Sequence, residues 1–398
     1  MTYLDWAATA PPDPDIITLQ AEAALEFPGN PSSPYPAGKA AKAALEEARE
    51  RCAAVLGCRP DQLAFTSGGT EADAIVLLAR LLLREPGTVL VGGLEHPAVA
   101  EPAAMLGRFG WSIKTVDPEA DGRIAPERLA AALNKNPDTR LVAVMGVNNE
   151  VGSVQPLEEL AAAVRKFERT AAEAAGGRSP RPIHFHADLV QALGKVPVDL
   201  GALDVDSAAF SAHKIRGPRG VGLLYHRNPK MEVLLKGGGQ EQGVRPGTEN
   251  VAGAISLAAA LEAHGRPDPR TAENGAWLRR KIEGLDGARI IPEARRGSSD
   301  DDPRYAPGIL AVAFPPVPGE VLARVLAETG YAVSTGSACS HNKKGKRPKS
   351  MAAMKVPKDV AEGMIRISIG PTTTRAELEG FLAALRQAVD VLGRAAGR

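Results

Sequence analysis

The 398-residue chain has little of several features that mark large classes of protein. Its three cysteines, Cys52, Cys58 and Cys339, are too few and too scattered for a disulfide framework or a CxxC zinc site. No apolar run is long enough to span a membrane, and the best run, 74–83, is interrupted by Arg80. The N-terminus shows no basic segment followed by an apolar stretch. We therefore expect a reduced, cytoplasmic protein that does not enter a membrane.

Charge of one sign and aromatic residues are scarce as well. The net charge is +1, which gives no electrostatic reason to expect binding to nucleic acid or to an anionic membrane. Aromatic residues make up 4% of the chain, whereas alanine and glycine are abundant, which favours close packing of helices on a sheet. The length is sufficient for a large core and for two domains.

Strand-like and helix-like stretches alternate through most of the chain, which predicts an α/β fold with a mostly parallel sheet. We predict an extended N-terminal arm at 1–20 that packs with a small domain, and a large domain at 21–260. Residues 261–398 should form that smaller α+β C-terminal domain. Within it, we expect the polar stretch 295–304 and the lysine-rich segment after Cys339 to be mobile.

Lys214 follows the small-residue apolar run 208–212, which indicates a buried strand. Partial desolvation at the end of such a strand lowers the pKa of a lysine, and a neutral amine can form a Schiff base with a carbonyl. Pyridoxal phosphate carries such a carbonyl. Ser211 and His213 stand beside Lys214 and could bind its phosphate. Taken alone, the pattern also fits an ordinary surface lysine after a strand.

A glycine-containing turn, Thr66-Ser-Gly-Gly-Thr-Glu71, joins a predicted strand to a helix. Glycines allow close backbone approach, and a helix N-terminus favours an anion, so Ser67, Gly69 and Thr70 are candidate phosphate donors. An ordinary glycine turn is the alternative. His96 stands at the start of another helix, where it could stack on a flat ring or could simply begin the helix.

Two further strand ends carry polar side chains. Asp188 ends a predicted strand, with Gln191 three residues later, and a carboxylate there can pair with a protonated pyridine nitrogen. His184 and His186 share a face of that strand, but no third ligand follows at metal-site spacing, so we predict no metal. Asn149 follows the strand predicted at 141–147 and could hold a carboxylate or only cap structure.

Cys339 lies among small polar residues, in Ser334-Thr-Gly-Ser-Ala-Cys339, and basic residues follow it that would favour a thiolate. Cys52 and Cys58, by contrast, flank alanines near a helix end and are expected to be structural. Arg366 belongs to an alternating apolar strand, from which it could bind a carboxylate in a cleft or simply point into water.

In their order, these motifs resemble those of the cysteine desulfurases, which are class V aminotransferase-like pyridoxal-phosphate enzymes. The resemblance covers nearly the whole chain and rests on Tyr3-Leu-Asp-Trp-Ala-Ala-Thr, Gly-Asn-Pro-Ser-Ser, Thr-Ser-Gly-Gly-Thr-Glu, Glu-His, Asn-Asn-Glu, Asp-x-x-Gln, Ser-Ala-His-Lys, Gly-Gly-Gly-Gln-Glu, Ser-Ala-Cys-Ser and Ile-Arg-Ile-Ser. It implies the aspartate aminotransferase-like fold. The spacing from Cys339 to Arg366 resembles the subgroup with a long cysteine loop.

The resemblance also implies a role for each site residue. Lys214 would form the Schiff base, Cys339 would attack the substrate's sulfur, and His96 would stack on the ring and assist proton transfer. The other implied contacts are Asp188 with the ring nitrogen, Gln191 with the ring hydroxyl, Thr70, Ser211 and His213 with the phosphate, Thr248 with the phosphate of the other subunit of a homodimer, and Asn149 and Arg366 with the substrate carboxylate.

The implied activity converts L-cysteine to alanine and leaves a persulfide for a sulfur-acceptor protein, for iron–sulfur cluster assembly or thiolation. A selenocysteine lyase, another class V aminotransferase and an inactive scaffold protein are the alternatives. The chain departs from the family pattern at Trp6, where many members have Asn, at Tyr35, where they have His, and at Pro246, where they have Ser. These departures affect the expected shape of the cleft entrance and of the dimer contact near Thr248.

Overall fold

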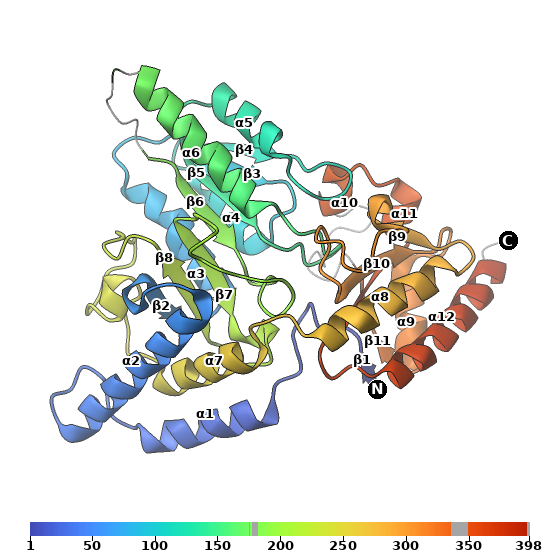
Figure 1. The fold of residues 1–398 in the computed structure, drawn as a ribbon, viewed down its shortest axis with the longest axis horizontal. Coiled ribbons are helices and arrows are strands. Elements are labelled where there is room, and N and C mark those ends of the chain that lie inside the picture. Colours follow the sequence, from blue (N-terminus) through green and yellow to red (C-terminus); the bar gives the residue numbers. More distant parts are fainter. Residues whose placement is uncertain (175, 177–181, 336–348, 396–398) are drawn as a thin grey trace.

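The computed structural model describes residues 1–174, 176, 182–335 and 349–395. A seven-stranded sheet and a four-stranded sheet organise these residues, and each is covered by helices (Figure 1). The helices α7 (Val251–His264) and α8 (Pro269–Glu283) follow one another where the chain passes from the first sheet to the second.

The larger sheet is mixed, with one strand opposed to its neighbours. Strand β8 is antiparallel to both β7 and β2, and the other pairings in the order β2-β8-β7-β6-β5-β3-β4 are parallel. The strands are β2 (Leu63–Thr66), β3 (Thr88–Gly92), β4 (Ser112–Val116), β5 (Thr139–Met145), β6 (His184–Asp188), β7 (Ser207–Ser211) and β8 (Gly222–His226). This confirms the predicted α/β fold with a mostly parallel sheet.

Helices cover both faces of this sheet, so its central strands are buried on both sides. In β5, Val142 and Val144 pack into one core while Leu141 and Ala143 pack into another, as the alternation of side chains along a strand requires. The first core also includes residues of α2 (Pro36–Leu56), α5 (Pro126–Lys135), α6 (Leu157–Ala174) and α7, and the second includes residues of α3 (Gly69–Leu78) and α4 (Pro97–Gly107).

The smaller sheet is antiparallel and has the order β12-β13-β10-β9. Its strands are β9 (Arg289–Ile291), β10 (Ile309–Ala313), β12 (Ser334–Thr335) and β13 (Met364–Ser368). Ile365 and Ile367 pack into a core with residues of α8, α9 (Gly319–Glu328) and α12 (Arg375–Ala395). Because side chains alternate along a strand, Arg366 lies on the opposite face from these isoleucines.

The N-terminal arm differs from the extended segment that we predicted for residues 1–20. Strand β1 (Thr2–Tyr3) pairs in parallel with β11 (Tyr331–Ala332), close to the small sheet. Helix α1 (Pro14–Glu26), however, begins within the predicted arm and packs on α7. Asp13 explains the start of α1, because its carboxylate accepts a hydrogen bond from the Asp15 N–H and Pro14 occupies the first turn.

The structure also bears on two other expectations about the chain's organisation. The domain boundary that we predicted after residue 260 stays a prediction, and residue 260 lies inside α7. Within the polar stretch 295–304, Arg295 is buried, and its guanidinium donates to the carbonyl groups of Val151, Ala306 and Ile309. The lysine-rich segment lies outside the described residues as far as 348, but α10 (Lys349–Ala353) and α11 (Lys358–Glu362) follow it.

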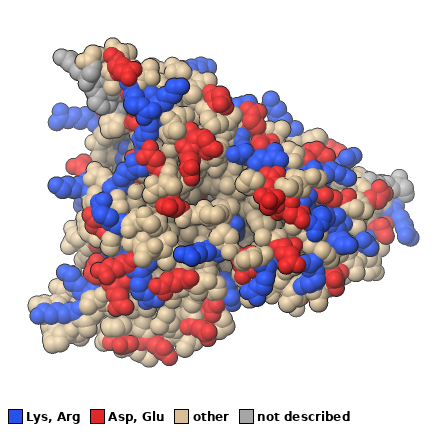
Figure 2. All heavy atoms as spheres, viewed as in Figure 1, with Lys and Arg blue, Asp and Glu red and all other residues tan. Residues whose placement is uncertain are grey.

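The surface of the described residues agrees with the balanced composition. Acidic and basic side chains are intermixed on the face shown in Figure 2. Among the described helices, none combines the length and the apolar character that crossing a membrane requires.

Candidate active site

A cavity of about 330 Å³ opens beside the carboxyl ends of the parallel strands, where ligands bind in open α/β sheets. Met145 and Asp188 end β5 and β6, and Ser211 ends β7. The cavity brings together most of the residues that the sequence singled out: Gly69, Thr70, His96, Asn149, Asp188, Gln191, Ser211, His213, Lys214 and Arg366.

Lys214 stands directly after β7, at the end of the short 3₁₀ turn Ala212–Lys214. Its Nζ donates to the carbonyl oxygens of Ala7 and Ala8, at 2.7 Å each. The N-terminal arm therefore crosses the mouth of the cavity and supplies hydrogen-bond acceptors to this amine, although the two segments lie more than 200 residues apart in the sequence.

Asp188 and Gln191 form the inner wall of the cavity, and both are nearly buried. Burial raises the pKa of Asp188 to about 7, with a further contribution from the nearby charge of Asp73. One oxygen of Asp188 accepts from the Val190 N–H. The Gln191 amide nitrogen donates to Ala7 O, whereas its buried Oε1 has no hydrogen-bond partner among the described residues. A buried acceptor without a protein partner is available to a donor group of a ligand.

The opposite end of the cavity is built around the N-terminus of α3. A Cβ on Gly69 would lie 2.4 Å from Val190 Cγ2, so only glycine fits at this position. Thr70 follows in the first turn, and Ser211 and His213 come from the β7 segment. Free backbone N–H groups at a helix start, together with hydroxyl groups, suit a phosphate.

His96 is the N-cap residue of α4, and its capping hydrogen bond determines which ring nitrogen is available to donate a proton. Its Nδ1 accepts from the Ala98 N–H at 3.1 Å, so in the neutral imidazole the hydrogen is carried by Nε2. Burial, and then the nearby charge of Lys214, lower the pKa of His96. His96 therefore presents a neutral ring to the cavity, with a proton donor at Nε2.

Arg366 reaches the cavity from β13 and is already engaged with two partners. Its Nη1 donates to Asn149 O at 2.8 Å, and its Nη2 forms an ion pair with Asp5 at 2.6 Å. The buried Nε has no partner among the described residues. Because these two partners fix the guanidinium in place, its unused N–H can donate to a carboxylate ligand.

Three of the predicted residues are not among those that line the cavity. Cys339 lies outside the described residues. Ser67 is exposed, and its N–H donates to the Glu71 carboxylate. Thr248 is exposed and does not line the cavity of its own chain. The other cysteines behave as expected for structural residues, because burial raises the pKa of both Cys52 and Cys58 to about 12.

Residues that sequence analysis missed also line the cavity, namely Asp5, Asp73, Met145 and Glu150. Asp5 stands in the quoted motif Tyr3-Leu-Asp-Trp, which was the available signal. Asp73 follows the glycine turn on α3, and Glu150 is the last residue of Asn-Asn-Glu. Burial raises the pKa of Glu150, whose carboxylate contacts Ser350 Oγ.

None of the three departures from the family pattern is among the residues that line this cavity. Trp6 is nearly buried, and a Cβ on Gly370 would collide with its ring, so the two residues are matched in size. Pro246 packs on Gly237 in the same way, because a Cβ there would lie 2.4 Å from Pro246 Cβ. Tyr35 is 52% exposed at the start of α2.

Comparison with known proteins places this architecture in a family. The model of the class-V aminotransferases matches residues 2–381. A cysteine desulfurase IscS of Dictyoglomus turgidum is 36% identical over 98% of this chain and 95% of its own. A NifS/IcsS protein homolog of Lactobacillus delbrueckii is 34% identical over 96% of both chains. The chain therefore belongs to the class-V aminotransferase family, among the cysteine desulfurases.

Solved structures agree with this assignment. A NifS-like protein superimposes with a TM-score of 0.85 at 33% identity and covers 98% of this chain and 100% of its own. A structure described as SspA in complex with cysteine gives a TM-score of 0.78 at 26% identity, and covers 94% and 100% of the two chains. Enzymes of this family depend on pyridoxal 5′-phosphate, which confirms the predicted cofactor.

The cavity fits that cofactor on its own chemistry. It offers a primary amine in Lys214, a buried carboxyl in Asp188, an unpaired acceptor in Gln191 and an anion-binding helix start at Gly69. A buried carboxyl whose pKa lies near 7 is stabilised as the carboxylate when a cationic N–H lies beside it.

Proposed function

We propose that the protein is a pyridoxal-phosphate-dependent cysteine desulfurase that transfers the sulfur of L-cysteine to Cys339. The observation that carries this proposal is the convergence of Lys214, Asp188 and Arg366 on one cavity. The bound cofactor supplies an electron sink for charge that develops at the substrate's α-carbon. The chain's own residues then bind the substrate, orient it and move its protons.

In this proposal, each end of the cavity has a separate task. Lys214 Nζ holds the cofactor and afterwards carries protons at the α-carbon. Asp188 would keep the ring nitrogen protonated, and Gln191 Oε1 would accept from the ring hydroxyl. Thr70, Ser211 and His213 hold the phosphate beside Gly69.

The substrate carboxylate binds to Arg366, beside Asn149. The Arg366 Nε that is unpaired among the described residues is the donor available to it, while the ion pair with Asp5 holds the guanidinium in position. His96 would stack on the cofactor ring, and its Nε2–H would give a proton to a group that becomes basic during the reaction.

The sulfur transfer itself balances without an added oxidant. The Cys339 thiolate attacks the substrate's sulfur, so that a sulfur–sulfur bond forms as the substrate's Cβ–S bond breaks. The electron pair of the broken bond remains on Cβ, which takes up a proton, and the products are alanine and a Cys339 persulfide. Cys52 and Cys58 are poor candidates for this role, because their raised pKa values disfavour the thiolate.

The experiment that tests the proposal is a single turnover with L-cysteine in the absence of reductant, followed by alkylation and mass spectrometry of the cysteine-containing peptides. We expect one equivalent of alanine and an added sulfur on Cys339. The Cys339→Ser variant should make neither product, whereas Cys58→Ser, the matched control, should make both. Persulfide on another cysteine, or full activity of Cys339→Ser, would show that the nucleophile is elsewhere.

We also propose that the enzyme acts as a cytoplasmic homodimer in which Thr248 of each subunit completes the phosphate site of the other. The exposure of Thr248, away from its own cavity, supports this arrangement. Sedimentation measurements should give a dimer. In addition, Thr248→Ala should weaken cofactor binding by about tenfold, as expected for the loss of one hydrogen bond to a charged group.

A further proposal concerns delivery of the sulfur to an acceptor protein, for iron–sulfur cluster assembly or thiolation. The basic residues Lys343, Lys344, Lys346 and Arg347, which lie outside the described residues, follow Cys339 in the sequence and would attract an acceptor with an acidic face. Transfer to such an acceptor should slow as salt rises, while sulfide release to a small neutral thiol should not. Equal salt dependence of both reactions would show that these basic residues do not bind the acceptor protein.

A further inference from the structure

A second cavity, of about 380 Å³, lies at the other end of β6 from the active site. His184, the first residue of β6, lines it, together with Ile183 before the strand and His226 at the end of antiparallel β8. The class-V site at the carboxyl edge of the sheet has no part in this cavity, and the two cavities share no lining residue among those described.

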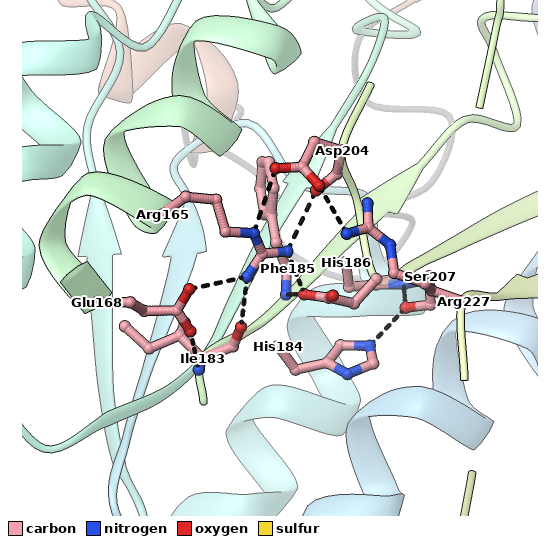
Figure 3. Close-up of polar contacts among 10 residues, drawn as sticks. Arg165, Glu168, Ile183, His184, Phe185, His186, Asp204, Ser207 and Arg227 are labelled. Atoms are coloured by element: carbon pink, nitrogen blue, oxygen red, sulfur yellow. Dashed lines mark hydrogen bonds and ion pairs between the residues drawn. The ribbon is translucent and has the colours of Figure 1, made fainter. Parts of the chain in front are cut away.

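Three acidic groups around this cavity, Glu168, Asp204 and Asp206, form ion pairs with two arginines. Arg165 forms ion pairs with Asp206 at 2.7 Å and with Glu168 at 3.1 Å. Asp204 lies between Arg165 and Arg227, and its carboxylate pairs with Arg227 at 2.6 Å and with Arg165 at 3.4 Å (Figure 3). Asp206 and Glu168 also accept backbone N–H groups, from Phe185 and Ile183 respectively.

Arg80 also lies at this cavity, but it takes no part in these ion pairs. It lies in the 3₁₀ turn Ala79–Leu82 and lines the cavity. Among the residues that the structure describes, its guanidinium has no hydrogen-bond or ion-pair partner, and its Nε is buried without one. Burial lowers the pKa of Arg80, partly offset by Asp206, but an arginine remains charged in proteins. Lys230 and Glu232, both exposed at the rim, add one charge of each sign.

A partly buried, unpaired guanidinium is costly, and it is stabilised by an anion that offers two acceptor oxygens. Apolar side chains also line the cavity and include Ala79, Met231, Leu82 and Leu83. Leu82 and Leu83 are 39% and 42% exposed, so the cavity has an apolar surface available for contact. An inorganic anion would leave this surface in water, whereas a carboxylate with an apolar body would cover it.

We propose that this cavity is a second ligand site, separate from the active site, which binds a small organic carboxylate through Arg80 with its apolar body against Leu82 and Leu83. The site is independent of the desulfurase reaction, since none of its residues contributes to the active-site cavity.

The test is a calorimetric titration of the cofactor-loaded protein with benzoate. We expect saturable binding with a Kd of about 1 mM or tighter, which Arg80→Gln weakens by about 10- to 100-fold, the loss expected for charge-assisted hydrogen bonds. Arg84→Gln is the matched control, because Arg84 is an exposed arginine of the same segment that does not line the cavity. This control should bind benzoate as the wild type does.

Two further probes separate the alternatives. Benzyl alcohol, which has the ring without the charge, should not bind, and sulfate, which has charge without the ring, should bind at least tenfold more weakly than benzoate. Equal binding of sulfate and benzoate would overturn the assignment to organic carboxylates. Absence of saturable binding to the wild type would overturn the site.

Because benzoate could also reach Arg366, its position must be observed directly. A crystal of the wild-type protein soaked in 4-bromobenzoate should show anomalous bromine density between Arg80 and the two leucines. Density confined to the active-site cavity, or no density, would contradict the proposal, even if Arg80→Gln failed to fold.

Discussion

The two cavities lie at opposite ends of β6, and they differ in how far their polar and charged side chains are paired within the protein. At the carboxyl end, the buried Oε1 of Gln191 and Nε of Arg366 have no partner among the described residues. At the amino end, Arg165 and Arg227 pair with the surrounding carboxylates, whereas the buried Nε of Arg80 and the buried Nε2 of His226 have no partner among the described residues.

Whether its polar atoms are paired distinguishes a side chain that stabilises the fold from one that is available to bind a ligand. The Arg165 network ties α6 to β6 and to the loop before β7, so its charges are used internally. The active-site residues converge from β6, β13 and the N-terminal arm, yet leave atoms unpaired that folding alone does not need. Unpaired buried groups are therefore the better guide to a ligand site than the number of charges.

The largest expected effect comes from removing the amine of the first cavity. Lys214→Ala should abolish turnover and the visible absorption of the lysine-linked cofactor, because no other described amine lines the cavity. Absorption spectra and alanine release measure the two losses. Lys114→Ala, on the exposed part of β4, is the control and should retain both. Sulfide release by Lys214→Ala at the wild-type rate would refute the assignment.

A second prediction concerns the pH dependence of the cofactor-free protein. Burial raises the pKa of Asp188 from 3.8 to about 7, so between these values the folded state binds a proton that the unfolded state has lost. The contribution of Asp188 is therefore complete below pH 4 and is lost as pH rises through 7. Relative to Asp188→Asn, the protein should lose up to about 4 kcal/mol of unfolding free energy over this range.

Urea unfolding of both proteins at several pH values measures this difference. In the cofactor-loaded protein the pyridine N–H should hold Asp188 ionised, so the difference between the two proteins should shrink. A pH-independent difference without cofactor would mean that Asp188 is not protonated in the folded state.

A third prediction addresses the carboxylate end of the active site. Arg366→Lys keeps the charge but loses the planar fork, so kcat/KM for cysteine should fall by about 10- to 100-fold while cofactor absorption is retained. Steady-state kinetics and spectra separate the two effects. Arg289→Lys, an exposed position in the same sheet, should change neither. Loss of cofactor together with activity would show that Arg366 supports the cofactor rather than the substrate.

Much of this architecture could be predicted from the sequence, because its signals are local. The run 208–212 predicted β7 and placed Lys214 at its end, and the glycine turn predicted the start of α3. The position of Asp188 at the end of β6 followed from the same reasoning.

The rest depends on contacts between distant segments. Nothing near Asp5 indicates that it pairs with Arg366, because the two meet only when the N-terminal arm lies against β13. The extended arm expected over residues 1–20 overlooked Asp13 and Pro14 as a helix start. Arg295 belongs to a polar stretch that we expected to be mobile, yet its guanidinium is buried among backbone carbonyls supplied from elsewhere in the chain.

The smallest expected effect concerns the polar chain that joins the two cavities. Asp73, which lines the active site, lies 2.9 Å from His186 Nε2, and His186 Nδ1 lies 2.8 Å from Ser207 Oγ. The same hydroxyl lies 2.7 Å from Nε2 of His184, which lines the second cavity. Ser207 is therefore the only described group that links the two histidines, and it is completely buried.

Ser207→Ala should leave one nitrogen of each histidine without this partner and reduce the unfolding free energy by about 1–3 kcal/mol, the usual cost of unsatisfied buried polar groups. Denaturant unfolding measures the loss, and Ser207→Thr, which keeps the hydroxyl, should recover part of it. Ser112→Ala is the control for removing a strand serine, because Ser112 lies on β4 and lines neither cavity. If Ser207→Ala is as stable as the wild type, the hydroxyl does not join the two histidines, and the two ends of β6 are independent.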